Sequence, residues 1–368
     1  MRAQCCVVGG GPAGMMAGLL LARQGVEVVV LEKRADFLRD FRGDTVHPST
    51  LQLFAELGWI EEFLDLSHTR MPQVTVNMGG RDVTFADFTR LNVRCPYIAF
   101  MPQWDVLDFL AAKAVAYPSF RLLRRARATD LITERGRVTG VLADTADGPL
   151  EVRADLVIGA DGRHSTVRDR AGLTPVSSSP PMDVLWFRLP RHPQDHVPFF
   201  QGGKGALISI DRGDYWQLAS AIPAGAFAEL KAAGPAAFRE RVAHLAPALR
   251  DRVEHLGGWA AVHHPSVRVD RLPRWHRPGL LCIGDAAHAM SPAGGVGINL
   301  AVQDAVATAN LLGPLLARGG TPEDADLARV QARRERAADL HRVPHAAAAA
   351  PPPRTFHRPG RPSEHIAA

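Results

Sequence analysis

Cysteine is scarce in this chain, which has four cysteines in 368 residues: Cys5, Cys6, Cys95 and Cys282. None belongs to a C-x-x-C pair, and three of the four lie in apolar runs that are typical of strands. This pattern argues against a disulfide framework and against a cysteine-based metal site. We therefore expect small core cysteines in a reduced, cytoplasmic protein with no metal site.

The sequence also has no visible leader peptide, because an apolar strand begins almost at the N-terminus. No apolar run approaches the roughly 20 residues that a membrane-spanning helix needs. The net charge is +5, but the arginines are scattered and form no basic stripe with interleaved aromatic residues. We therefore expect no membrane span and no nucleic-acid partner, and the length suggests two or three lobes of a soluble enzyme.

A glycine-rich turn near the N-terminus is the clearest motif that is present. An apolar run precedes the G-x-G-x-x-G pattern of Gly9, Gly11 and Gly14, and a helix follows from Pro12. Gly9 allows a tight turn, Gly11 lets a pyrophosphate approach the backbone, and Gly14 lets the helix lie close to the strand. The helix N-terminus at Pro12 and Ala13 offers free N–H groups and a positive dipole end to that pyrophosphate.

A second β-branched run ends in Glu32, 18 residues after Gly14. A carboxylate about 20 residues after the glycines can accept hydrogen bonds from ribose hydroxyls and would repel a 2′-phosphate. A G-x-G-x-x-G pattern alone is weak evidence, but the strand, the helix predicted over 12–24 and the acid all agree. The sequence therefore predicts a site for the adenosine end of FAD or NAD.

Two later segments repeat the pattern of an apolar strand followed by a polar turn. Residues 154–160 lead into Asp161, and residues 280–283 lead into Gly284 and Asp285. Such turns lie where open α/β sheets bind ligands, beyond the carboxyl ends of the strands. Between them, residues 180–275 are rich in proline and aromatic residues, which indicates a sheet-rich lobe inserted into the first lobe.

Two further helices and a β-meander are predicted from local pattern. A helix is expected over 51–57, capped by Ser49 or Thr50 and closed by Gly58. Residues 120–157 are expected to form a β-meander, not a βαβ unit. A long amphipathic helix is expected from about Gly297 to Leu316, after a glycine-rich bend.

Three motifs occur in matching order and spacing: the glycine turn, Asp161-Gly162 with Ser165 and Arg168, and Gly284-Asp285 with the bend from Pro292 to Asn299. Over about residues 1–340 the chain thereby resembles the single-component flavoprotein monooxygenases typified by para-hydroxybenzoate hydroxylase. The resemblance implies an α/β fold with a Rossmann-like FAD-binding lobe and an interleaved sheet-rich (α+β) substrate lobe. The expected boundaries are 1–72, 101–180 and 276–342 for the FAD-binding lobe, 73–100 and 181–275 for the substrate lobe, and 343–368 for a disordered tail.

The implied function is an FAD-dependent monooxygenase that uses NAD(P)H and O2. It would hydroxylate or epoxidise an aromatic or polyketide-like small molecule through a flavin C4a-hydroperoxide, as a monomer or homodimer. Only one dinucleotide fingerprint is present, so NADH and NADPH both remain open. The resembled proteins continue through further helices, whereas this chain becomes rich in alanine and proline after about residue 343.

The resemblance also implies roles for single residues. Glu32 would hold the adenosine ribose, Asp285 the ribityl or ribose hydroxyls, and Asp161 would serve FAD and transient NAD(P)H. Arg42 could equally form an ion pair with a neighbouring aspartate, but the family places a cofactor contact there, as at Gln103. The predicted cofactor-binding residues are Gly9, Gly11, Pro12, Ala13, Gly14, Glu32, Lys33, Arg42, Gln103, Asp161, Arg168, Gly284, Asp285, Pro292, Gly295, Val296, Gly297, Ile298 and Asn299.

Candidates for the chemical step are fewer. N–H groups of the helix from Gly297 would stabilise the anionic reduced flavin, and Pro292 would stiffen the loop beside the ring. His47 is a weak candidate for a base, because a lone histidine in a loop is more often simply hydrogen-bonded. The candidate substrate-wall residues are aromatic, although each alone is more typical of a core: Trp186, Phe187, Tyr215 and Trp216.

Other functions remain open at this level. A flavin-dependent halogenase shares the FAD-binding lobe, but its expected Trp-x-Trp-x-Ile-Pro stretch is not found in this sequence. A flavin-dependent isoprenoid reductase and an FAD-binding, non-catalytic partner protein are further alternatives. Substrate-stimulated NAD(P)H oxidation with an oxygenated product would separate the monooxygenase from all three.

Overall fold

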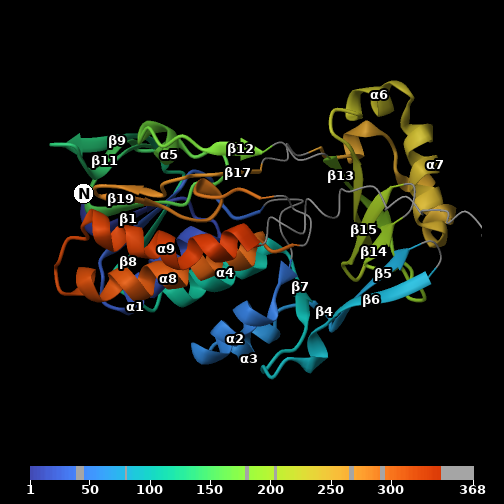
Figure 1. The fold of residues 1–368 in the computed structure, drawn as a ribbon, viewed down its shortest axis with the longest axis horizontal. Helices are drawn as coiled ribbons and strands as arrows, with labels where there is room; N and C mark the ends of the chain where they lie inside the picture. The colour runs from blue at the N-terminus through green and yellow to red at the C-terminus, as the bar shows by residue number, and fades with distance from the viewer. Residues whose placement is uncertain are drawn as a thin grey trace, which may run out of the picture.

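The fold was analysed in a computed structural model, which describes residues 1–38, 45–78, 81–178, 182–202, 205–264, 269–290 and 295–340. Two of the predicted site residues, Arg42 and Pro292, lie outside these residues, as does the predicted tail. Figure 1 shows a larger lobe with a central sheet and a smaller lobe beside it, joined by several passages of the chain. The predicted mixed α/β fold is confirmed.

A mostly parallel sheet forms the centre of the larger lobe, in the order β18-β19-β11-β1-β2-β8. Strand β1 pairs with β2 on one side and with β11 on the other, so the order of the chain reverses at β1. Ligands bind at such a reversal, beyond the carboxyl ends of the strands. The strands are β1 (Arg2–Val8), β2 (Val28–Glu32), β8 (Phe120–Arg124), β11 (Gly148–Gly159), β18 (His276–Arg277) and β19 (Leu280–Cys282).

Both faces of this sheet are buried, because successive residues of a strand point to opposite faces. Cys5 and Val7 of β1 join a core formed with the helices, whereas Cys6 and Val8 join a core under an antiparallel extension of the sheet. Burial raises the pKa of the Cys6 thiol to about 12. The elements are helices α1 (Pro12–Arg23), α4 (Gln103–Ala114), α8 (Gly297–Ala317) and α9 (Asp324–Leu340) on one face, and β9 (Arg127–Glu134), β10 (Arg137–Thr145) and α5 (Thr166–Arg170) on the other.

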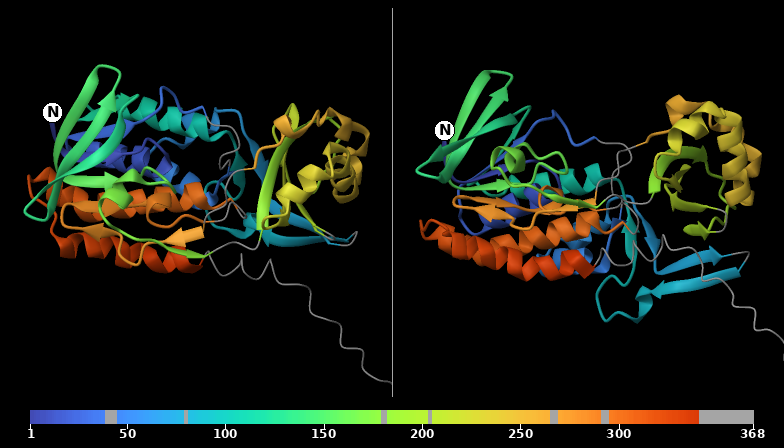
Figure 2. Two further views of the ribbon diagram at one scale, coloured as in Figure 1. Left: turned by 90° about the horizontal axis from the view of Figure 1, so that it is seen from above. Right: turned by 45° about the horizontal axis from the view of Figure 1, so that its top comes forward.

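The smaller lobe is a six-stranded sheet in the order β13-β16-β15-β14-β5-β6. Its strands come from two distant segments of the chain, which meet where β14 pairs with β5. One face packs on helices α6 and α7 and the 3-10 segment η2 (Figure 2). The elements are β5 (Gln73–Met78), β6 (Arg81–Asp87), β13 (Met182–Pro190), β14 (Phe200–Gly202), β15 (Ala206–Asp211), β16 (Tyr215–Pro223), α6 (Phe227–Ala232), α7 (Pro235–Leu245) and η2 (Pro247–His255).

Short elements connect the two lobes. A three-stranded sheet in the order β3-β7-β4 lies between them, and a second link is the antiparallel pair of β12 and β17. Leu272 and Trp275, which fall in the segment predicted for the smaller lobe, pack in the core of the larger one. The elements are β3 (Thr45–Val46), α2 (Pro48–Glu56), α3 (Ile60–Leu64), β4 (Thr69–Met71), η1 (Phe88–Arg90), β7 (Ile98–Phe100), β12 (Val176–Ser178), η3 (Trp259–Ala261), β17 (Val269–Arg271) and η4 (Gly284–Ala286).

Two local predictions were wrong. Helix α2 begins at Pro48 with His47 as its N-cap, and neither Ser49 nor Thr50 caps it, because proline already suits the first helical position. The β-meander holds for β9, β10 and β11, but β8 pairs parallel with β2 in the central sheet.

The expectation of no apolar run near membrane-spanning length also needs correction. Helix α8 is long and apolar enough, by length and composition alone, to cross a membrane. However, most of this helix is buried inside the molecule, where α8 packs against α1 and α9. Its apolar character is that of a central core helix.

Candidate functional site

The glycine turn after β1 has the geometry that the motif predicts. Gly9 has a φ of +108°, and a Cβ there would lie 2.3 Å from the carbonyl oxygen of Ala160. A Cβ on Gly14 would lie 1.9 Å from the carbonyl oxygen of Gly9, so this glycine lets α1 lie against the turn. A Cβ on Gly11 would meet no atom within 4 Å, which leaves open space above the backbone.

The N-terminus of α1 faces this open space. Gly11 is the N-cap and supplies no side-chain hydrogen bond, and Pro12 occupies the first helical position. The N–H groups of the first turn have no partner within a helix, and they carry its positive dipole end. The turn therefore offers an anion a bare backbone and uncapped N–H donors.

Glu32 lies at the end of β2, directly beside the turn. One of its carboxylate oxygens accepts a hydrogen bond of 2.9 Å from the backbone N–H of Gly10, and the other accepts one of 2.9 Å from the N–H of Arg34. These bonds hold the carboxylate, which is only 8% exposed, in one orientation beside the turn. Lys33 is exposed, and Gln103, at the start of α4, is half-buried.

Asp161 follows β11 and contacts the same turn, because a Cβ on Gly9 would lie 2.8 Å from its Cα. Its carboxylate accepts hydrogen bonds from the Ser165 hydroxyl and the Val167 N–H, and so fixes the start of α5. Burial raises the pKa of Asp161 above its ordinary value, although these hydrogen bonds act to lower it. Arg168 is buried and donates to the carbonyl oxygens of Arg163 and Ala286, so it joins this segment to the third motif.

The third motif, Gly284-Asp285, lies against the start of α1. Gly284 has a φ of +59°, and a Cβ there would lie 3.0 Å from the Cβ of Ala13. The Asp285 side chain remains 36% exposed, with Arg163 Nη2 3.7 Å from one carboxylate oxygen. Residues from three distant parts of the chain thus meet at the reversal point of the sheet.

The N-terminus of α8 lies beside the start of α2. Asn299 is buried, and its Oδ1 accepts hydrogen bonds from the His47 N–H and the Thr50 hydroxyl, each 2.8 Å long. Its Nδ2 donates to the carbonyl oxygens of Thr45 and Gly295. The side chain of Asn299 therefore clamps the segment 45–50 to the first turn of α8.

Four other predicted residues lie in the same turn. Helix α8 begins at Gly297 with Val296 as its N-cap, and the Val296 side chain makes no capping hydrogen bond. Gly295 has a φ of +61° and packs against Thr45, and Ile298 points into the core of the larger lobe. The N–H groups at this helix start are thus available to a bound group, as they are at α1.

The predicted aromatic wall residues lie on different faces of the second sheet. Trp186 packs with the cluster of Ile98, Phe100 and Ile210, which lies between the lobes. Phe187 and Trp216 instead belong to the core beneath α7, where the Trp216 indole N–H donates 2.9 Å to Asp195. Tyr215 lies under the guanidinium of Arg188, 4.8 Å from the ring centroid.

The residues present fit the group that the sequence predicts. A cradle without side chains above Gly11, two uncapped helix N-termini, a fixed carboxylate at Glu32 and an accessible one at Asp285 surround one region. Backbone N–H groups at helix starts bind phosphates, and carboxylates bind sugar hydroxyls. This donor set suits the pyrophosphate and the hydroxyls of FAD.

The sequence alone does not indicate two further residues, Asp304 of α8 and Arg334 of α9. Asp304 is fully buried and accepts a hydrogen bond of 2.9 Å from the backbone N–H of Gly284. Arg334 Nε donates a hydrogen bond of 2.8 Å to the other carboxylate oxygen of Asp304. Leu327, Val330 and Arg334 are the buried residues among the described side chains of α9, and their spacing of i, i+3 and i+7 is that of one helix face. The two apolar residues at this spacing are the sequence signal that could have predicted α9.

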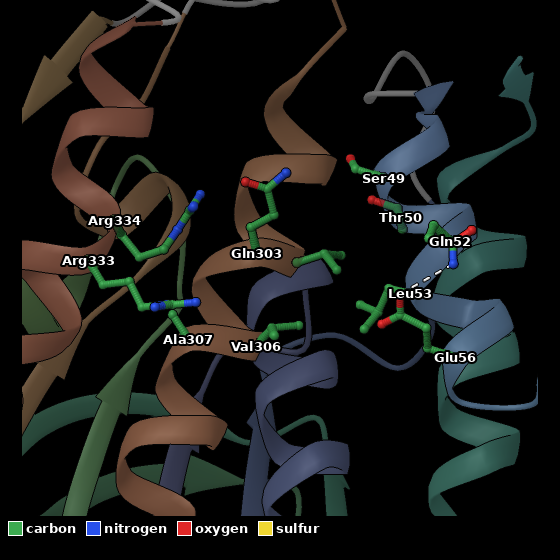
Figure 3. Close-up of a pocket in the computed structure, with 11 residues that line it drawn as sticks. Ser49, Thr50, Gln52, Leu53, Glu56, Gln303, Val306, Ala307, Arg333 and Arg334 are labelled. Carbon is green, nitrogen blue, oxygen red and sulfur yellow. Dashed lines mark hydrogen bonds between the residues drawn. The ribbon is translucent and has the colours of Figure 1, made fainter. Parts of the chain in front are cut away.

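A groove of about 260 Å³ lies between α2, α8 and α9. Figure 3 shows Gln303 of α8 between the arginines of α9 and the polar side chains of α2. Of the residues predicted for the cofactor or the substrate, none that the structure describes lines it. The groove is therefore distinct from the site at the end of the sheet.

Comparisons with known proteins agree with this geometry. The FAD binding domain family matches residues 2–342. The chain is 35% identical over 339 residues to 6-methylpretetramide 4-monooxygenase of Streptomyces rimosus, with 90% of this chain and 81% of that protein covered. It is 31% identical over 316 residues to rifampicin monooxygenase of Streptomyces venezuelae, with 81% of this chain but 61% of that protein covered.

Two solved structures illustrate the shared fold. PqsL of Pseudomonas aeruginosa, in complex with 2-aminobenzoylacetate, matches with a TM-score of 0.82 at 22% identity over 94% of this chain and 95% of that chain. OxyS anhydrotetracycline hydroxylase of Streptomyces rimosus matches with a TM-score of 0.74 at 24% identity over 94% of this chain and 68% of that chain. At these identities the two structures support the architecture alone.

Proposed function

The chain belongs to the FAD binding domain family and is an FAD-dependent monooxygenase, and from this premise we propose that it hydroxylates a polycyclic, polyketide-like aromatic molecule. The observation that carries the substrate class is the 35% identity to 6-methylpretetramide 4-monooxygenase, together with the apolar surface between the lobes. NAD(P)H is the electron donor, and O2 is the oxygen source.

The residues proposed to hold FAD divide into two groups. The turn from Gly9 to Gly14 and Glu32 would bind the ADP half, because they combine uncapped N–H groups with a fixed carboxylate. Asp285 and the start of α8 at Gly297 would bind the ribityl chain and the flavin ring. Bound FAD supplies the redox chemistry that activates O2, and the protein positions it and excludes water.

The apolar cluster between the lobes is the proposed wall of the substrate chamber. Ile98 and Phe100 come from β7, Ile210 comes from β15, and Trp186 packs against them from β13. An apolar, aromatic wall favours a flat apolar ring system over a small charged acid. Exclusion of bulk water there also limits wasteful formation of hydrogen peroxide.

His47 is the proposed base for a substrate phenol. Its backbone N–H is held by Asn299 at the first turn of α8, so the residue lies beside the proposed flavin-binding turn. It is also the N-cap of α2, where its side chain makes no capping hydrogen bond. Replacement by Gln would keep the cap and remove the base, and kcat for a phenol should then fall by about 10²-fold or more.

Location and assembly are part of the same proposal. We expect the enzyme to act in the cytoplasm as a monomer or homodimer. Either NADH or NADPH could serve as donor, and initial rates with each, at equal concentration, decide between them. Arg42 and Pro292 keep their proposed roles beside FAD, although they lie outside the described residues.

Product analysis tests the function. The FAD-loaded protein is incubated under ¹⁸O2 with NADPH or NADH and with 6-methylpretetramide, other polycyclic phenols or para-hydroxybenzoate. We expect polycyclic phenols to stimulate NAD(P)H oxidation and to gain one labelled oxygen atom. Conversion of para-hydroxybenzoate alone, or a chlorinated product in the presence of chloride, would contradict the proposal.

A pair of tryptophan variants tests the chamber wall. Trp186→Ala should raise KM for the accepted phenol by about tenfold, because it removes apolar surface from the wall. Trp216→Phe is the matched control, because its ring lies under α7 and its change should leave KM within about twofold. Equal effects of the two variants on KM would place the substrate elsewhere.

A further inference from the structure

A buried group of charges lies behind the Gly284-Asp285 turn. It consists of Asp304, which is 0% exposed, His288 at 7% and Arg334 at 8%. These residues come from three elements: the segment after η4, the middle of α8 and the middle of α9. None of them is in the set predicted to contact the cofactor.

Asp304 is the centre of this group. Its Oδ2 accepts from the backbone N–H of Gly284 at 2.9 Å and lies 2.6 Å from His288 Nε2. Its Oδ1 accepts from Arg334 Nε at 2.8 Å. A buried carboxylate is tolerated when its lone pairs are filled and its charge is balanced, and both conditions are met here.

The bond to Gly284 gives this group a role beyond packing. Gly284 lies in the left-handed region and touches Ala13 at the start of α1, so the turn is held by α1 on one side and by Asp304 on the other. The next residue is Asp285, whose carboxylate is accessible. The direction of Asp285 therefore depends on a hydrogen bond from the backbone of its neighbour to Asp304.

Helix α9 contributes to this arrangement through one side chain. Arg334 is buried against Asp304, whereas the adjacent Arg333 is exposed on the wall of the outer groove. Figure 3 shows the two arginines leaving α9 side by side. Both arginines line the groove, but only Arg334 is buried and contacts Asp304, so Arg333 is a neighbouring control of the same residue type.

We propose that Asp304 and Arg334 are positioning residues for the ribityl-flavin half of FAD, acting through the backbone N–H of Gly284. They do not touch the cofactor. They hold the turn that carries Asp285, whereas the ADP half is held independently by the glycine turn and Glu32. The inference concerns the cofactor alone and stands whatever the substrate is.

Binding of FAD and of ADP to the apoprotein separates the two halves. Arg334→Gln should weaken FAD binding by about tenfold or more, because it removes one of the two cationic partners of Asp304, and should leave ADP binding within about twofold. Asp304→Asn should show the same selectivity with a larger loss for FAD. Glu32→Gln should weaken both ligands, and Arg333→Gln should change neither. Titration by flavin fluorescence, with ADP as competitor, gives all these constants.

A purely structural role would give a different result. If Arg334→Gln weakened FAD and ADP equally, or changed neither, the proposal would be overturned. Thermal melting of each apoprotein shows whether the variants fold. If Arg334→Gln or Asp304→Asn does not fold, Arg334→Lys keeps the charge but changes the geometry, and it should weaken FAD alone by a smaller factor. Equal losses for both ligands in that variant would also refute the proposal.

Discussion

The two glycine-containing turns at the end of the central sheet are built in different ways. In the turn from Gly9 to Gly14 the tightest contact is local, since a Cβ on Gly14 would strike the carbonyl of Gly9 itself, while Glu32 and Ala160 hold the turn from further along the chain. The turn at Gly284 depends on Asp304, 20 residues later, and through it on Arg334, 50 residues later. The start of α8 likewise depends on Thr45 and His47, about 250 residues earlier.

The two turns therefore differ in how far along the chain the contacts that shape them lie. In the first turn, the spacing of the glycines itself permits the close contact of Gly14 with Gly9, so the motif predicts the geometry even though distant residues also hold it. In the second, the same residue types take their positions because distant buried groups satisfy their hydrogen bonds. The effects of substitutions should therefore differ in kind between the two turns.

The largest effect is expected for Gly14→Ala. The added methyl group would lie 1.9 Å from the Gly9 carbonyl oxygen, and backbone atoms on both sides cannot move away without shifting α1 from the sheet. We expect a loss of about 4 kcal/mol or more in the free energy of unfolding, or no soluble protein. Chemical denaturation measures it, and a loss below about 1 kcal/mol would contradict the steric explanation.

A smaller but substantial effect is expected for Asn299→Ala. The substitution removes the hydrogen bonds of Asn299 to the His47 N–H, the Thr50 hydroxyl and the Thr45 carbonyl, and loss of a bond to a buried polar group costs about 1–3 kcal/mol. We expect a loss of about 3 kcal/mol in the free energy of unfolding and faster proteolysis near residues 45–50. Thr308→Val, which removes one hydroxyl bond elsewhere on α8, is the control and should cost less.

Gly11→Ala should separate binding from folding. The added methyl group meets no protein atom within 4 Å, so the stability of the apoprotein should change by less than about 1 kcal/mol. The same methyl group would occupy the space proposed for the pyrophosphate, so FAD affinity should fall by about tenfold or more. Unchanged FAD affinity would show that the cofactor does not approach the backbone at this glycine.

The smallest effect is a dependence of stability on pH at the second turn. Burial alone would lower the pKa of His288, but the Asp304 carboxylate raises it overall. Burial alone would raise the pKa of Asp304, but His288 and Arg334 lower it overall. The contribution of His288 is thus lost as pH rises through its raised folded pKa, and that of Asp304 is lost as pH falls through its lowered one.

Apoprotein stability should therefore be highest between the ordinary pKa values of the two groups, at about pH 4 to 6.5 as far as this pair is concerned. Melting temperature as a function of pH measures this. Asp304→Asn should flatten both limbs, and an unchanged profile in that variant would mean that other groups cause the dependence.

Much of the fold could be predicted from local pattern. The strand, turn and helix at residues 2–23 and the helix from Gly297 match their sequence signals, because steric limits and helix periodicity act over a few residues. Helix α9 was not predicted, since only Leu327, Val330 and Arg334 of its described side chains are buried. The capping of α2 was predicted wrongly, since Thr50 donates its hydroxyl to Asn299 far away in the sequence.

The candidate site, like the fold, could be predicted where local sequence pattern determines the structure. The glycines and acids could be named, and the structure brings Gly9, Asp161 and Gly284 together. The partition of the aromatic residues between two faces of a sheet could not be predicted, because one residue of register decides the face. Asp304 and Arg334 carry no motif, and only the packing of α8 on α9 shows what they do.

The smaller sheet has a consequence for biosynthesis. Strands β5 and β6 leave the ribosome long before β14, which pairs with β5, and β13, β15 and β16 are also far from them in the sequence. At the usual ~5–20 residues per second, roughly a hundred intervening residues delay the pairing by about 5–20 seconds. During that time the edge of β5 that later pairs with β14 is unpaired, and such an edge favours association between chains. We therefore expect co-expression of chaperones to raise the soluble yield of this enzyme.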